Sequence, residues 1–108
     1  MITEHIIFER YNALLQRCQH ILSHWHIQPA GIAFTNRKGV YGLAHPHGGI
    51  SINNAFLGTD AIAKLDQTIL HELAHLVAYE RNPSRAIKGH GREWQLACAD
   101  LGIPGESA

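Results

Sequence analysis

The sequence predicts an α+β domain, with helices toward both ends of the chain and a small sheet between them. Apolar residues recur at three- and four-residue spacing over residues 3–25, 60–81 and 91–100, as in amphipathic helices. Residues 30–53 instead hold short apolar runs separated by turns that contain glycine, which is typical of strands. A chain of 108 residues is long enough for one modest core, so we expect residues 1–108 to form a single domain.

The first predicted element is one long helix from Thr3 to about Trp25, with Thr3 as its N-cap. Its apolar stripe is best explained by core packing. The stripe consists of Ile7, Tyr11, Leu14, Leu15, Cys18, Ile21, Leu22 and Trp25. Cys18 and Cys98, the only two cysteines, both fall in helical patterns and are expected to be buried free thiols.

The middle of the chain predicts a three-stranded, mostly antiparallel sheet. The expected strands are residues 31–35, 40–44 and 50–53, joined by a turn over 36–39 and a loop over 45–49. An edge strand can pair with an extended peptide by strand addition. We therefore treat strand addition to this sheet as a hypothesis for peptide binding.

Two further helices complete the fold. Residues 54–58 form a short helical turn, after which Thr59 or Asp60 caps a central helix that runs to about Arg81. Pro83 ends that helix, since proline disfavours helix at the preceding residue. The last helix spans about 91–100, with Gly102 as its C-cap, and residues from about 103 to 108 are expected to fray. The expected packing residues are Ile62, Leu65, Ile69, Leu73, Leu76, Val77, Trp94, Leu96, Ala97 and Leu101.

The central helix contains H-E-L-A-H at residues 71–75. Residues four apart lie on one face of a helix, so His71 and His75 can direct both imidazoles to one point. Neutral imidazole nitrogens are common zinc ligands. Glu72 lies near enough to hold a zinc-bound water without ligating the metal. This arrangement is typical of metal-assisted peptide hydrolysis.

A third ligand is needed, and His90 in G-H-G-R-E-W is the best candidate. Glycines on both sides of His90 let the backbone approach closely. We predict one Zn²⁺ per chain, bound by His71, His75 and His90 with an open fourth position. The competing explanation is coincidence in a chain that has nine histidines. Helical context, apolar flanks and the placement of His90 all favour the zinc site.

These residues carry a family resemblance. H-E-L-A-H followed by G-H-G-x-x-W resembles the SprT-like zinc metallopeptidase family, the SprT/Spartan type. Residues 31–33 and 50–53 look like that family's strand pair before the active-site helix. The resemblance implies a zincin-like domain whose C-terminal helix carries the third His. Many members continue into a cysteine-rich zinc ribbon, which this sequence, ending at Ala108 with two cysteines, does not show.

The predicted function is a zinc-dependent endopeptidase with Glu72 as the general base on a zinc-bound water. The resemblance implies a protein substrate, with DNA-bound or DNA-crosslinked proteins as candidates. Nine basic and nine acidic residues give no net charge, which does not support strong nucleic-acid binding. Basic residues near the predicted site form either a local rim or a solvated loop. They are Arg37, Lys38, Arg81, Arg85, Lys88 and Arg92.

Other side chains are further candidates for the site. Tyr79, four residues after His75, is preferred over Tyr41 as the hydroxyl that stabilises an oxyanion. Trp94 is expected in the core beneath the site. His45 and His47 form either a second metal or substrate site or, as we prefer, an exposed pair. Four carboxylates are expected either to orient a ligand imidazole or to face solvent. They are Asp66, Glu80, Glu93 and Asp100.

Two other functions remain open on sequence alone. The domain is an adaptor that binds protein or nucleic acid around a structural zinc, or it is a metal-dependent nuclease built on three histidines. No apolar run approaches the roughly 18–20 residues that span a membrane, and no signal peptide is visible. We therefore expect a cytoplasmic protein without a membrane partner. The sequence leaves the oligomeric state open.

Overall fold

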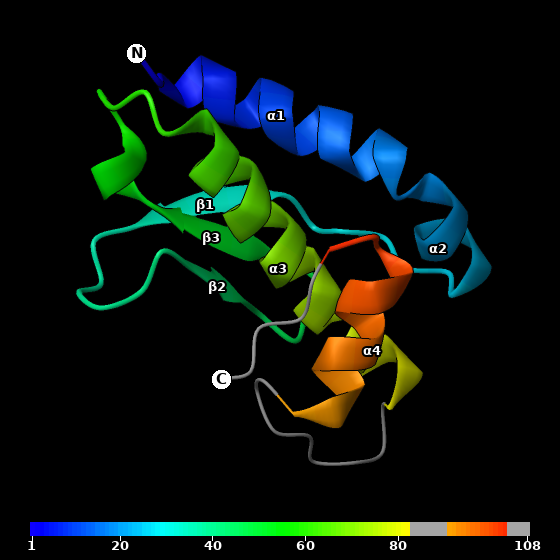
Figure 1. Cartoon of the computed structure of the whole chain (residues 1–108). Helices are drawn as coiled ribbons and strands as arrows, with labels where there is room; N and C mark the ends of the chain where they lie inside the picture. Colours follow the sequence, from blue (N-terminus) through cyan, green and yellow to red (C-terminus); the bar gives the residue numbers. More distant parts are fainter. Residues whose placement is uncertain (83–90, 104–108) are drawn as a thin grey trace.

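The structure, a computed structural model, describes residues 1–82 and 91–103. Its elements are α1 (Glu4–Arg17), α2 (Gln19–His24), β1 (Ile32–Thr35), β2 (Gly42–Ala44), β3 (Ile50–Asn53), the 3₁₀ turn η1 (Asn54–Phe56), α3 (Ile62–Arg81) and α4 (Arg92–Asp100). The α3 helix runs through the middle of the fold and contacts the sheet, α1 and α4 (Figure 1). The predicted α+β class is confirmed, and α3 and α4 end where the sequence predicts.

The N-terminal segment is not one helix, because it divides at Cys18. This residue has φ −95° and ψ 7°, and it is both the C-cap of α1 and the N-cap of α2. Its amide donates to the carbonyls of Leu14 and Leu15, at 3.0 and 3.2 Å, which tightens the last turn of α1. The apolar spacing continues across the break, so periodicity does not reveal it. The N-cap prediction is confirmed: Thr3 Oγ1 accepts from the Ile6 amide at 3.2 Å.

The sheet is mixed rather than mostly antiparallel. The strand order is β1-β3-β2, with β1 parallel and β2 antiparallel to β3. Ile50 and Ile52 of β3 are 1% and 0% exposed, so the most apolar strand takes the central position. The predicted strand over 40–44 shortens to Gly42–Ala44 and lies at the edge.

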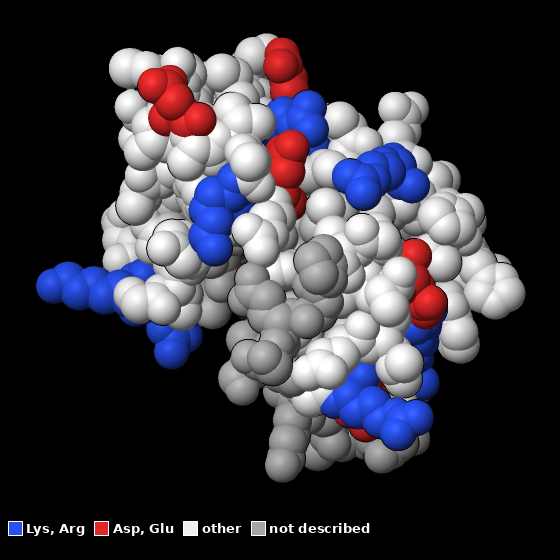
Figure 2. Space-filling view, viewed as in Figure 1, with Lys and Arg blue, Asp and Glu red and all other residues white. Residues whose placement is uncertain are grey.

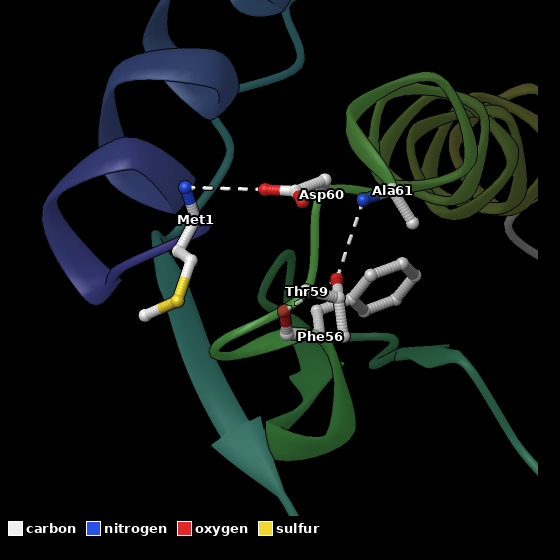
Figure 3. A network of polar contacts seen from close by, with 5 residues as sticks. All are labelled: Met1, Phe56, Thr59, Asp60 and Ala61. Atoms are coloured by element: carbon white, nitrogen blue, oxygen red, sulfur yellow. Dashed lines mark hydrogen bonds and ion pairs between the residues drawn. The ribbon is translucent and has the colours of Figure 1, made fainter.

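The start of α3 also differs from the prediction. Its N-cap is Ala61, which has no side-chain capping bond, rather than Thr59 or Asp60. Thr59 Oγ1 accepts from the Ala61 amide at 3.3 Å and donates to the Phe56 carbonyl at 2.8 Å (Figure 3). The Asp60 carboxylate lies 3.2 Å from the amino group of Met1. These two side chains fasten α3 to η1 and to the start of the chain instead of capping the helix.

The core lies around α3. Apolar side chains of α3 that are 4% exposed or less are Leu65, Ile69, Leu70, Leu73, Ala74, Leu76, Val77 and Ala78. The C-cap of α4 is Leu101 rather than the predicted Gly102, which follows it with φ +77°, a conformation that commonly ends a helix. Ile103 is only 8% exposed and its amide bonds the Cys98 carbonyl at 3.0 Å, so fraying does not begin there. Residues 104–108 lie outside the described part. Cys18 and Cys98 are buried free thiols, as predicted.

Candidate active site

A cleft of about 480 Å³ lies between α3 and the edge strand β2. One wall is a single stripe of α3, because positions separated by three or four residues share a helix face. The residues of that stripe are Lys64, Thr68, His71, Glu72, His75 and Tyr79. The other wall is formed by residues 39–44, and Trp94 of α4 lines the cleft as well. The structure thus brings His71, Glu72 and His75 into one concave site.

Trp94 holds the two histidines from below. The His71 and His75 ring centroids each lie 5.4 Å from the Trp94 ring, the first edge-on at 76° and the second stacked at 25°. The indole Nε1 donates to the His71 carbonyl at 3.1 Å. Trp94 is 2% exposed, which confirms the prediction that it lies in the core beneath the site. This packing fixes both imidazoles against one rigid surface.

Glu72 lies beside the histidines on the cleft wall and is half-buried. Burial raises the pKa of its carboxyl to about 7, because the charged form loses hydration. A carboxyl group whose pKa lies near neutral pH can both accept and donate a proton. The structure therefore gives Glu72 an environment that an exposed surface glutamate lacks.

Gly42 of β2 is a site residue that the sequence analysis missed. A Cβ at this position would lie 2.9 Å from Thr68 Cγ2, 3.0 Å from the Ser51 carbonyl oxygen and 3.1 Å from Glu72 Cγ. Only glycine lets β2 approach α3 this closely without a shift. A glycine inside a strand pattern often marks a close approach of backbone, so the signal was present in the sequence.

Two tyrosines line the cleft from opposite walls. The Tyr79 ring is stacked with His75, with centroids 6.2 Å apart, so its expected position on the histidine face is confirmed. Tyr41 precedes β2 and is 61% exposed, and Lys64 Nζ lies 4.6 Å from its ring centroid. Of the two tyrosines, Tyr79 is the one whose ring packs against a histidine of the cleft.

The remaining acidic candidates do not line the cleft. Asp66 receives two hydrogen bonds of 2.8 Å from the Arg10 guanidinium. Asp100 forms an ion pair of 2.6 Å with Arg81, whose guanidinium also lies 5.1 Å from the Trp25 ring. Glu80 is exposed, and Glu93 is half-buried in the first turn of α4. Arg81 is thus held by α4 rather than placed on a basic rim.

The histidines of the β2–β3 connection form a stacked pair. Their ring centroids lie 5.4 Å apart and the ring planes are parallel within 1°. His45 Nε2 lies 2.9 Å from Ser51 Oγ, and His47 Nδ1 accepts from the Gly49 amide at 3.3 Å. His47 is exposed as predicted, whereas His45 is half-buried. Neither histidine lines the cleft.

His90, the predicted third ligand, lies outside the described residues, as do Arg85 and Lys88. Across residues 1–82 and 91–103, no group of three or more His, Cys, Asp or Glu side chains is arranged to hold a metal ion. What the described part provides is two imidazoles on one helix face with a carboxylate beside them. That donor set suits zinc once a further ligand is added.

Comparison with known proteins identifies the family of this chain. The model of the SprT-like family matches residues 5–105. Protein SprT of Glaesserella parasuis serovar 5 is 30% identical over 84 residues, which cover 76% of this chain and 53% of that protein. Protein SprT of Pseudomonas aeruginosa is 30% identical over 102 residues, covering 89% of this chain and 61% of that protein. The chain belongs to the SprT-like family.

The similarity extends to other pseudomonads, with limits in length. Protein SprT of Pseudomonas putida strain F1 is 39% identical over 66 residues, or 60% of this chain and 40% of that protein. The chain thus spans about half to three fifths of the length of the first two SprT proteins that it matches. No solved structure matches it significantly. Among the described helices, none has the length and apolar character needed to cross a membrane.

Proposed function

We propose that this chain is a zinc-dependent endopeptidase domain that hydrolyses peptide bonds in proteins. The observation that carries the proposal is the placement of His71, Glu72 and His75 together in one cleft, in a member of the SprT-like family. The proposed ligands of one Zn²⁺ are His71, His75 and His90. Support for His90 comes from its position in the chain, four residues before Trp94, which packs against both imidazoles.

The residues of the cleft have complementary roles in this reaction. When bound, zinc supplies a Lewis acid that polarises the scissile carbonyl group. Glu72 accepts a proton from the attacking water and later delivers it to the leaving amine. The hydroxyl of Tyr79 donates a hydrogen bond to the developing oxyanion. Trp94 keeps both imidazoles in place and excludes water from beneath them.

The outer edge of β2, with which no strand in the described part of the chain pairs, supports a polypeptide substrate. The Asn53 amide donates to the Tyr41 carbonyl at 2.9 Å, and the His45 amide donates to the Gly49 carbonyl at 2.8 Å. Because such bonds alternate along an antiparallel ladder, the backbone groups of Gly42 and Ala44 point away from β3. This edge thus offers both donors and acceptors beside the cleft, as an extended peptide requires.

The test combines metal analysis with protein cleavage. We expect about one zinc per chain in the wild type and in Glu72→Gln, and much less in His71→Ala and His90→Ala. Glu72→Gln should lower the rate of protein cleavage by roughly a thousandfold or more, because the proton acceptor is lost. Glu80→Gln is the matched control, since Glu80 is exposed on the same helix and lies outside the cleft.

Each alternative predicts a different result. An adaptor with a structural zinc would keep its binding activity in Glu72→Gln and show no cleavage in the wild type. A three-histidine nuclease would degrade RNA or DNA and leave unfolded protein intact. Undiminished protein cleavage by Glu72→Gln would remove Glu72 from the mechanism. The link to DNA rests on family resemblance. Cleavage of DNA-bound proteins should therefore be compared first with cleavage of proteins free of DNA.

A further inference from the structure

The cleft has a second end, which the proposed chemistry does not use. Lys64 lines it from the first turn of α3, and its Nζ lies over the ring of Tyr41 on the opposite wall. The side chain is exposed, and no ion pair within the described residues involves it. The nearby Asp60 carboxylate contacts the amino group of Met1 instead. The lysine charge therefore faces the cleft without a carboxylate against it.

A second hollow of about 520 Å³ adjoins this end and adds two further cations. It is lined by residues 36–41, Asn53 and Ala55, so it shares residues 39–41 with the cleft. Arg37 and Lys38 lie on its exposed rim, and no ion pair among described side chains involves either. Figure 2 shows Lys and Arg atoms over the β1–β2 connection and over the start of α3 on the same face.

The charges that line the two hollows are unequal. Of the described residues in both linings, three are cationic and one, Glu72, is acidic. Glu72 lies at the histidine end, eight residues along α3 from Lys64. A concave surface lined by one sign of charge attracts the opposite sign, more strongly at low salt. The Lys64 end is therefore complementary to an anionic group.

The chemistry of the cleft wall favours an anionic peptide over a nucleic acid. The edge of β2 that faces away from β3 presents amide donors as well as carbonyl acceptors, through Gly42 and Ala44. A peptide main chain satisfies both kinds of group. The phosphate groups of a nucleic acid only accept hydrogen bonds, so they would leave these carbonyls without partners.

We propose that Lys64, with Arg37 and Lys38, forms a specificity subsite for an acidic side chain of the substrate. The proposal rests on the proposed peptidase function and specifies which substrates are preferred. Lys64 and His71 are separated by seven residues of helix, or roughly 10 Å at 1.5 Å per residue. An extended peptide advances about 3.3 Å per residue. The preferred Asp or Glu thus lies about three residues from the cleaved bond.

The test measures binding, so that it does not depend on cleavage. Fluorescein-labelled peptides carry Glu three residues before or three residues after a central apolar pair, and matched peptides carry Gln at the same positions. Fluorescence anisotropy is measured with zinc-supplied Glu72→Gln protein. We expect one of the two Glu peptides to bind about fivefold more tightly than its Gln partner, with the difference shrinking as salt rises.

Three second-site variants locate the effect. Lys64→Gln, and the double change Arg37→Gln with Lys38→Gln, should reduce the preference for Glu to less than twofold. Lys64→Arg should keep it. Arg17→Gln is the control, because Arg17 is an exposed cation of α1 that lines neither hollow. Circular dichroism verifies that each variant is folded.

The outcomes separate this proposal from the peptidase function. Equal binding of Glu and Gln peptides, a preference that persists in Lys64→Gln, or no peptide binding would overturn the subsite. Binding of single-stranded DNA in place of the Glu peptide would overturn it in favour of a nucleic-acid surface. A wild type that cleaves protein but shows no preference retains the peptidase function alone. A preference that depends on Lys64 without any cleavage retains the subsite alone.

Discussion

The two faces of α3 have different roles: one packs in the core and stabilises the fold, and the other carries the residues of the proposed site. On the inner face Leu65, Ile69 and Leu73 are each 0% exposed and pack in the core. On the cleft face Lys64, His71 and Glu72 lie beside open space, and the proposed site depends on them. Both faces follow the same helical period. The inner face buries apolar side chains away from water, whereas the cleft face keeps polar side chains accessible.

What lies opposite each face differs as well. The inner face meets α1 and β3, the strand buried at the centre of the sheet. The cleft face meets β2, a short edge strand, and Trp94 of α4. Substitutions on the inner face should therefore change the free energy of unfolding, whereas substitutions on the cleft face should mainly change activity. The following predictions test this division, from the largest expected effect to the smallest.

Leu73→Ala should cause the largest loss of stability, about 2–5 kcal/mol, because it leaves a cavity in a fully buried position. Urea unfolding at fixed zinc concentration measures it. Protein that remains folded should still bind zinc and cleave substrate, although Leu73 lies within the H-E-L-A-H motif. Loss of zinc binding by folded Leu73→Ala protein would contradict the division between the faces.

Gly42→Ala should reduce both stability and activity, since the added methyl group meets Thr68, the Ser51 carbonyl and Glu72. Overpacking of this kind costs about 1–3 kcal/mol. We also expect Glu72 to shift, so the turnover rate measured with one fixed peptide should fall by about tenfold. Gly58→Ala is the control, because Gly58, unlike Gly42, has positive φ, at +81°, and no atom lies within 4 Å of the added Cβ. It should lower stability and leave turnover unchanged.

Glu72→Gln should stabilise the metal-free protein at high pH. Burial raises the pKa of Glu72 from 4.5 to about 7, so the folded state binds this proton more tightly than the unfolded state does. Stability is therefore lost as pH rises from about 4.5 to about 7, and the full penalty applies above that range. With chelator present, Glu72→Gln should be more stable than wild type by on the order of 1–2 kcal/mol at pH 8 and equal to it at pH 4. An equal difference at both pH values would mean that the charge of Glu72 is not the cause.

Asp66→Asn should have the smallest effect, because it removes part of one partly buried ion pair between α1 and α3. Arg10 and Asp66 form two hydrogen bonds, so the loss should be about 1 kcal/mol and should shrink in high salt. Thermal unfolding measures the loss. Turnover should not change, since Asp66 does not line the cleft. A large fall in turnover would place Asp66 in the site after all.

Sequence periodicity predicted the elements that carry the site better than those that support it. The 20-residue α3 helix has a continuous pattern, and the motif at 71–75 specifies its own geometry. Cys18 lies in an uninterrupted apolar stripe, so nothing local marks the division between α1 and α2. Strand order depends on which strand is most deeply buried, and this is a property of the whole fold. The parallel pairing of β1 with β3 could not be read from short apolar runs alone.

The cleft itself was only partly predictable. His71, Glu72, His75 and Tyr79 follow from spacing along one helix, which is local information. The contact of Gly42 with Glu72 and the position of Lys64 over Tyr41 join residues that are distant in sequence, so only the folded chain shows them. The same holds for Asp66, whose partner Arg10 lies 56 residues away.

In the described sheet β2 is an edge strand that pairs with β3, and this has a consequence for the evolution of the domain. This strand is three residues long, and one wall of the cleft consists of it and the turn before it. Insertions or deletions in residues 36–41 would reshape the mouth of the cleft and leave β1, β3 and α3 in register, because surface turns tolerate changes of length. Substrate range can therefore diverge among descendants of this chain while the histidine-bearing helix is inherited unchanged.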